Sequence, residues 1–301
     1  MRWSKIVEAL VSTSDRFTQF LWNLTLTSDQ VTDARTKYDG VAKKLHGHYF
    51  TTEFTGDTRK LIGSYGKGTA VRPPRDVDIV FLLPSTVYDR YKARSGNVQS
   101  QLLQEVRAVL QERYSSTDIR GDGQVVVVPF QNGHSVEVLP GWRTTDKKFL
   151  VPNTHDGGHW QTVDHDAEIA QVQSSDTRSS GNTRNLIKML KSWQRECSVP
   201  IKSLVLELRS VNFLKKWQYY DKGATYYDWM VRDFLAELLE YKNGTCVMPG
   251  TVEKIDYGRA WASKAESALG RARKACGFEQ EKKDRKATEE WRKVFGAQYE
   301  F

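Results

Sequence analysis

The sequence predicts an α+β protein with a mixed-sheet lobe in its first part and a mainly helical lobe in its second. Residues 77–83 are β-rich and almost continuously apolar, which is typical of a strand covered on both faces. Helix-like and strand-like patterns alternate up to about residue 150, whereas most later segments repeat apolar residues every three or four positions. We therefore expect two domains, residues 1–160 and residues 161–301.

The first lobe contains two expected helices and three expected strands. A helix over residues 28–48 carries apolar residues on one face, and Thr27 and Gln30 are spaced as a capping box at its start. Residues 99–114 give the second helical pattern. The strands are expected at residues 77–83, 124–130 and 134–139, with a hairpin turn at Asn132-Gly133 between the last two.

The second lobe begins after a segment that predicts a loop. Residues 152–166 are rich in Gly, Asp and His; their composition suggests metal binding, but their spacing and the lack of nearby cysteine favour a turn over a zinc site. Helical patterns follow at residues 186–193, 204–214, 226–241 and 260–276. The charged residues 279–293 predict a solvent-facing terminal helix.

Composition excludes several classes of protein. The chain has 301 residues, of which 39% are hydrophobic and 27% charged, which is typical of globular proteins. Its apolar runs are far shorter than the ~20 residues needed to span a bilayer, and Glu8 interrupts the apolar patch near the N-terminus, so neither a membrane span nor a secretory signal is predicted. Three widely spaced cysteines argue against a disulfide framework. We expect a cytoplasmic protein.

The formal net charge of +8 is concentrated in one segment. Residues 184–216 contain eight basic side chains and two acidic ones. This surplus is compatible with an ordinary solvated helix face or with a surface that binds the phosphates of nucleotides or nucleic acids.

A candidate site is built around two aspartates. On a strand, Asp76 and Asp78 project from the same face, and their mutual repulsion predicts a divalent cation such as Mg²⁺ between them. Gly63 lets the preceding loop approach closely, and Ser64 offers a hydroxyl and an N–H group to a phosphate. Glu137 lies between apolar residues of a later strand and is the natural third acid.

The order Gly63-Ser64, eleven residues, then Asp76-Val77-Asp78-Ile79 resembles the signature of the polymerase-β-type nucleotidyltransferase superfamily. The longer strings "GSYGKGTAVRPPRDVDIVFLLP", "SVEVLPGW" and "LIKMLKSWQRECSVPIKSLVLEL" are similar to the bacterial CD-NTases, relatives of cyclic GMP-AMP synthase that act in anti-phage CBASS defence. Within that family the sequence resembles clade G. The resemblance implies a polymerase-β-type nucleotidyltransferase fold over nearly the whole chain.

The resemblance also implies roles for individual residues. Asp76, Asp78 and Glu137 would be the catalytic acids and would ligate two Mg²⁺ ions, with Mn²⁺ as a substitute, although the family's third acid is commonly aspartate. Gly63 and Ser64 would hold the donor triphosphate, and Lys191 and Ser203 would contact its β- and γ-phosphates. Lys188, one helical turn before Lys191, is the alternative lysine.

The leading functional hypothesis is template-independent synthesis of a cyclic di- or trinucleotide from nucleoside triphosphates, with release of pyrophosphate. One alternative is a nucleotidyltransferase that acts on an RNA or protein acceptor, and another is a catalytically weak nucleic-acid-binding sensor. For the leading hypothesis the expected partners are the nucleotide substrates, a CBASS effector reached through the product, and CBASS regulatory proteins. No membrane and no obligatory nucleic-acid ligand are expected.

Overall fold

The computed structural model describes residues 12–131 and 134–300, and the packing divides them into two units. The sheet unit comprises residues 26–173 and 247–253, and the helical unit comprises residues 12–25, 174–246 and 254–300. This division differs from the expected boundary after residue 160, because the first helix belongs with the C-terminal helices and the sheet unit extends into a helix that begins at residue 165.

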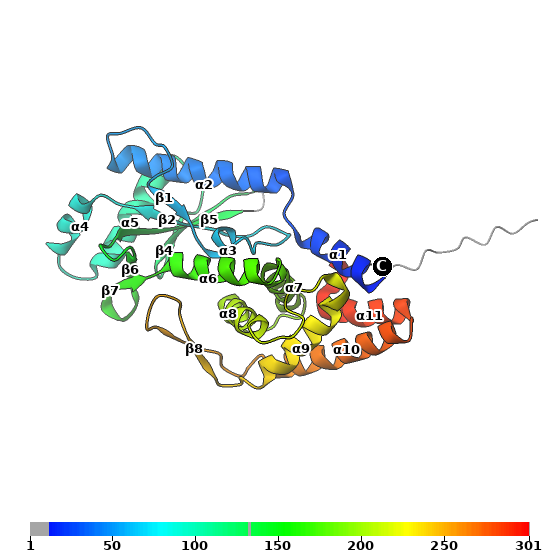
Figure 1. Ribbon diagram of the computed structural model, residues 1–301. Coiled ribbons are helices and arrows are strands. Elements are labelled where there is room, and N and C mark those ends of the chain that lie inside the picture. The colour runs from blue at the N-terminus through cyan, green and yellow to red at the C-terminus, as the bar shows by residue number, and fades with distance from the viewer. Residues whose placement is uncertain (1–11, 132–133, 301) are drawn as a thin grey trace, which may run out of the picture. The chain divides into compact units, whose positions relative to one another are not determined.

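Seven strands form one mixed sheet within the described part of the sheet unit (Figure 1). Strand β2 runs parallel to β5 and antiparallel to β1, and β5 pairs antiparallel with both β4 and β6. The predicted turn at Asn132-Gly133 lies outside the described residues. The strands are β1 (Arg59–Leu61), β2 (Val77–Leu82), β3 (Arg120–Asp122), β4 (Val125–Pro129), β5 (Ser135–Arg143), β6 (Phe149–Asn153) and β7 (His159–Val163).

One face of this sheet is covered by helices. The long helix α2 packs on β2 and β5, and α5 packs on α2 and on β3 and β4. Thr27 and Gln30 form the predicted capping box at the start of α2. The alternate residues Val77, Ile79 and Phe81 of β2 are fully buried in the core beneath these helices, which leaves Asp78 on the opposite face. The helices are α2 (Ser28–Tyr49), α3 (Gly63–Lys67), α4 (Ser85–Lys92), α5 (Val98–Gln111) and α6 (His165–Arg178).

The loop expected at residues 152–166 is instead a β-hairpin followed by the first turn of α6. Strands β6 and β7 pair antiparallel, with Pro152 opposite Trp160, and a short 3₁₀ turn, His155–Gly157, joins them. The prediction was wrong because β7 is an edge strand with few apolar side chains, and its Trp160 is stabilised by packing against Trp142 of β5. Helix α6 was not predicted either, since its apolar residues are few; the carboxylate of Asp164 accepts from the N–H of Ala167 in its first turn.

The helical unit packs its first helix, α1, against its last two. The rings of Phe17 and Phe20 contact Phe295 and Tyr299, and the fully buried guanidinium of Arg16 pairs with Glu279. These long-range contacts place α1 in this unit. The helices are α1 (Thr13–Leu24), α7 (Asn182–Glu196), α8 (Ser203–Leu214), α9 (Tyr227–Leu239), α10 (Ala262–Gln280) and α11 (Asp284–Phe295), with short 3₁₀ turns at Ala224–Tyr226 and Gly296–Gln298 and a hairpin of β8 (Thr245–Val247) and β9 (Lys254–Asp256).

A membrane-spanning helix is absent from the part of the chain that the structure describes, since none of its helices is both long and apolar enough.

Candidate active site

The segment predicted to bind phosphate, Gly63-Ser64, packs directly against Asp78 of β2; we call it the phosphate loop. The N–H of Ile62 donates to the carbonyl oxygen of Asp78 at 3.0 Å, which attaches the loop to β2. Gly63 has a φ of 55°, a left-handed conformation that favours glycine. A Cβ at this position would lie only 2.7 Å from the Cγ of Asp78. The site therefore needs glycine here, because any larger residue would displace the carboxylate.

The structure brings Asp78 and Glu137 together as direct partners on parallel strands. In the β2–β5 register Asp78 is opposite Glu137, and Val77 is opposite Val136. Paired residues on neighbouring strands point to the same face of a sheet, so both acids lie on the face opposite the helix-covered core. Asp76 lies two residues before Asp78, immediately ahead of β2. The three predicted acids thus occupy one neighbourhood beside Gly63 and Ser64.

Asp76 is oriented by a residue that the sequence did not single out. The hydroxyl of Ser135, the first residue of β5, donates to Oδ1 of Asp76. Ser135 lies two residues before Glu137 and therefore on the same face of the strand. This spacing was readable from the sequence, but only register with β2 shows that the serine reaches Asp76.

The acids repel one another strongly. Burial, and then the charges of Asp78, Asp76 and Asp122, raise the pKa of Glu137 to about 7. Asp122 ends β3, and it was also missed, because it approaches Glu137 only through the pairing of β3, β4 and β5. A cation bound between these carboxylates would relieve their repulsion and favour the ionised form of Glu137. The electrostatics of the site therefore favour binding of a cation.

The donor chemistry of these residues suits a hard divalent cation, which prefers carboxylate oxygens. Within residues 12–131 and 134–300, no group of three or more His, Cys, Asp or Glu side chains is arranged as it stands to hold a metal ion. This applies to the three acids and equally to the His and Asp side chains of residues 155–166.

Lys191 and Ser203 belong to the helical unit, where each already has a partner. Nζ of Lys191 lies 2.8 Å from Oε1 of Glu207, and both side chains are about nine-tenths buried, at 11% and 7% exposure. The hydroxyl of Ser203 donates to Oε1 of Gln194 at 2.8 Å. Burial lowers the pKa of Lys188, and the charge of Arg184 lowers it further. Their contacts with a triphosphate stay a prediction.

A protein-family model matches residues 11–175, more than half of the chain. Its description is "Second Messenger Oligonucleotide or Dinucleotide Synthetase domain". The match contains the phosphate loop and all three acids. A search of curated protein sequences finds no match.

Solved structures share the fold at low sequence identity. The Vibrio cholerae DncV cyclic AMP-GMP synthase, in complex with a linear intermediate, is 13% identical over 94% of this chain and 97% of its own, with a TM-score of 0.71. CdnC of E. coli MS115-1, in complex with HORMA-deltaN, is 16% identical over 96% and 98%, with a TM-score of 0.68. The Bradyrhizobium diazoefficiens CD-NTase CdnG, in complex with GTP, is 10% identical over 95% and 96%, with a TM-score of 0.65.

These matches confirm the predicted α+β nucleotidyltransferase fold. The three solved relatives have nearly equal scores, so the predicted assignment to clade G stays a prediction. The family uses divalent metal ions, in keeping with the carboxylates described above. The chain therefore belongs to the family of second messenger oligonucleotide or dinucleotide synthetases, and it is a nucleotidyltransferase with the fold of the bacterial CD-NTases.

Proposed function

We propose that this protein joins nucleoside triphosphates, without a template, into a cyclic di- or trinucleotide second messenger for anti-phage CBASS signalling in the cytoplasm. The observation that carries the proposal is the pairing of Asp78 with Glu137 beside the Gly63 turn. This geometry places two acids, whose charges attract cations, directly against the Gly63 backbone. The family description supports the synthesis of an oligonucleotide messenger.

The chemistry is a series of phosphoryl transfers, two for a cyclic dinucleotide and three for a cyclic trinucleotide. A ribose hydroxyl of the acceptor attacks the α-phosphorus of the donor; the bond from that phosphorus to the bridging oxygen breaks, pyrophosphate leaves, and the hydroxyl proton passes to solvent. In the last transfer a hydroxyl of the linear product attacks its own 5′ α-phosphorus, which releases a further pyrophosphate and closes the ring. Two Mg²⁺ ions would neutralise the developing charge when bound.

Each group of residues has one task in this scheme. Asp76, Asp78 and Glu137 would hold the metal ions, and Ser135 orients the carboxylate of Asp76. The Gly63-Ser64 turn holds the triphosphate at the end of β1. Lys191 and Ser203 are proposed to contact its β- and γ-phosphates. Positioning and charge neutralisation supply most of the rate enhancement in phosphoryl transfer, so no further ionisable group is required.

The structure weakens the alternatives that need a nucleic acid. Four of the eight basic residues between positions 184 and 216 form ion pairs inside the helical unit: Arg184 with Asp176, Lys191 with Glu207, and both Arg209 and Lys216 with Glu237. Charges that are neutralised in this way contribute little to an RNA-binding surface. The sensor hypothesis also leaves the Asp78–Glu137 pair without a role.

Regulatory proteins are proposed partners. CdnC of E. coli MS115-1, which has the same fold, was solved in a complex with HORMA-deltaN. An effector would be reached through the nucleotide product.

The test is to incubate the purified protein with labelled ATP, GTP, CTP and UTP and Mg²⁺, without nucleic acid, and then to treat the products with phosphatase. We expect a phosphatase-resistant product that Asp76→Ala/Asp78→Ala abolishes. The matched control Glu53→Ala/Asp89→Ala removes two exposed acids of the same unit and should leave the product unchanged. If a product forms only when RNA or a protein acceptor is added, the proposal is overturned.

A further inference from the structure

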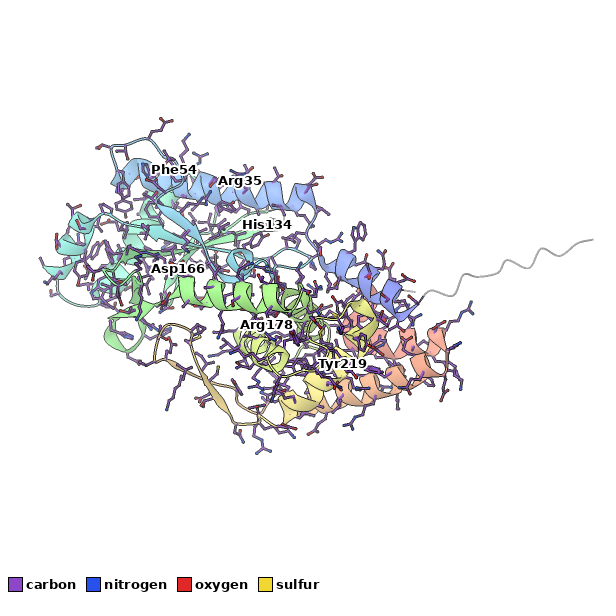
Figure 2. The ribbon with its side chains drawn as sticks, in the orientation of Figure 1. Arg35, Phe54, His134, Asp166, Arg178 and Tyr219 are labelled. Atoms are coloured by element: carbon purple, nitrogen blue, oxygen red, sulfur yellow. The ribbon has the colours of Figure 1, made fainter. Side chains whose placement is uncertain are left out.

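Three polar side chains form a hydrogen-bonded chain that ends at the phosphate loop. Nδ1 of His134 lies 2.9 Å from Oδ2 of Asp33, which is on α2, and its Nε2 lies 2.6 Å from the hydroxyl of Tyr65, which is on α3. Figure 2 labels His134, which lies between α2 and the sheet. All three residues belong to the sheet unit.

The direction of the hydrogen bonds follows from the chemistry of the end groups. The carboxylate of Asp33 can only accept, so Nδ1 of His134 carries a proton and donates it. In the neutral imidazole Nε2 is then an acceptor, and the hydroxyl of Tyr65 donates to it. Burial raises the pKa of Tyr65 to about 12, and the charge of Asp33 also raises it, so this hydroxyl stays a donor at neutral pH.

The central member of this hydrogen-bonded network, His134, is buried, whereas the side chain of Asp33 is 45% exposed. The imidazole of His134 is 1% exposed, so neither of its nitrogens can exchange its partner for bulk water. A buried donor or acceptor that loses its partner costs about 1–3 kcal/mol. Asp33 is held at the other end by Lys37, whose Nζ lies 2.6 Å from the same Oδ2 atom. The position of the Tyr65 hydroxyl is therefore fixed from α2.

Two members of this network, Tyr65 and His134, are next to active-site residues in the sequence. Tyr65 directly follows Ser64 in the phosphate loop. His134 directly precedes Ser135, which donates to Asp76, and lies three residues before Glu137. The hydrogen bonds of Asp33, His134 and Tyr65 thus connect the segment expected to hold the triphosphate with the strand that carries the third acid.

We propose that Asp33, His134 and Tyr65 are positioning residues that hold the Gly63-Ser64 turn in the conformation that binds the donor triphosphate. The inference rests on the proposed function and adds to it residues that touch no substrate. Without the Tyr65 hydroxyl the turn would sample other conformations, and the triphosphate would have to bear the cost of ordering it.

The test compares two Tyr→Phe changes. Tyr65→Phe removes the hydroxyl that donates to His134, whereas Tyr88→Phe removes one from another partly buried tyrosine of the same core cluster. The ring of Tyr88 packs on Trp142, and its hydroxyl makes no hydrogen bond to any described residue. The probe is inorganic tripolyphosphate with Mg²⁺, which does not depend on the unknown base specificity, and its dissociation constant is measured by calorimetry on the full chain.

We expect Tyr65→Phe to weaken tripolyphosphate binding about tenfold, which corresponds to ~1.4 kcal/mol, and Tyr88→Phe to leave it within twofold. Asp33→Asn keeps an oxygen that accepts from Nδ1 of His134 and should retain most of the affinity, whereas Asp33→Ala should match Tyr65→Phe. The double variant Asp33→Ala/Tyr65→Phe should bind as well as either single variant, since both substitutions interrupt the same hydrogen-bonded network.

Equal affinity for tripolyphosphate in Tyr65→Phe and Tyr88→Phe overturns the inference. A lower melting temperature of Tyr65→Phe without a loss of affinity also overturns it, because the three hydrogen-bonded side chains would then have a purely structural role. These outcomes leave the proposed function intact as long as the unaltered protein binds tripolyphosphate and forms its product. Failure of the unaltered protein to do either overturns the proposed function and the inference together.

Discussion

Asp78 on β2 and Glu137 on β5 are register partners on parallel strands, with the Gly63 turn packed against the carboxylate of Asp78. A parallel pair of this kind requires a crossover between its strands, which here spans residues 83–134 and includes α4, α5 and the β3–β4 hairpin. The active-site acids are therefore brought together by the topology of the sheet. Substitutions at the points of closest approach test this arrangement most directly.

Gly63→Ala should reduce activity while the fold is retained. Its Cβ would lie 2.7 Å from Cγ of Asp78, and the backbone has a φ of 55°, so the substitution adds strain of about 1–3 kcal/mol and displaces the carboxylate. We expect product formation to fall by about tenfold or more on this basis. Gly47→Ala is the control, because a Cβ on this α2 residue meets nothing within 4 Å. It should raise stability by ~0.5–1 kcal/mol and leave the rate unchanged. Equal rates in the two variants would contradict the close packing of loop and acid.

Ser135→Ala should weaken the response to metal. The hydroxyl of Ser135 donates to Asp76, and groups that orient a ligand typically change metal affinity or activity by about 10–100-fold. We expect a higher Mg²⁺ concentration for half-maximal product formation, with little change in melting temperature. Ser85→Ala, at an exposed position at the start of α4, is the matched control. A titration that superimposes on that of the control would show that Asp76 needs no support from Ser135.

The parts of the fold that have a clear local pattern were predictable. The Thr27/Gln30 box and the apolar face of residues 28–48 correspond to α2, and the apolar run at residues 77–83 corresponds to β2. Segments whose structure depends on packing against other elements were not. Strand β7 is stabilised by pairing with β6 and by the packing of Trp160, which no local pattern reveals.

The same distinction applies to the site. Gly63, Ser64, Asp76, Asp78 and Glu137 lie on elements with readable patterns, and the structure brings them into one neighbourhood. Asp122 and His134 could not be predicted, because their approach to the site depends on strand register and on a hydrogen bond to α2. A sequence pattern gives the face of a strand on which a residue lies, but not what it meets there.

Glu137→Gln should separate the stability of the metal-free protein from its activity. The folded-state pKa of Glu137 is about 7, above its unfolded value of 4.5, so the native protein retains the proton more tightly and loses stability as the pH rises from about 4.5 to about 7. Glutamine does not titrate, so the variant should gain on the order of 2 kcal/mol relative to the unaltered protein between pH 5 and pH 8, a figure reduced from the full pKa difference because solvent screens this partly exposed carboxyl.

Urea unfolding in EDTA at the two pH values measures this gain. Glu53→Gln, at an exposed position, is the control and should show no such pH dependence. Saturating Mg²⁺ should stabilise the unaltered protein more than Glu137→Gln, and the variant should lose product formation. If both proteins follow the same stability profile in EDTA, repulsion among the acids is not a feature of the native site.

The pair of Lys191 and Glu207 allows a structural role to be separated from phosphate binding. Both side chains are buried, so Glu207→Gln removes the negative charge that balances the Lys191 ammonium and should destabilise the protein by about 3–5 kcal/mol. Lys191→Met should cost a similar amount for the converse reason. The double variant Lys191→Met/Glu207→Leu removes both charges and should recover most of the stability.

The affinity for tripolyphosphate shows whether Lys191 also contacts a phosphate. If its ammonium also contacts the β- or γ-phosphate, the double variant will fold well and yet bind tripolyphosphate more weakly than the unaltered protein, because no cation replaces the lost one. Lys202→Met, at an exposed position before α8, is the control and should retain full affinity. A double variant that recovers stability and affinity together would restrict Lys191 to a structural role, and the same measurement on Lys188→Met would then test the neighbouring lysine, one turn earlier on α7, as the phosphate ligand.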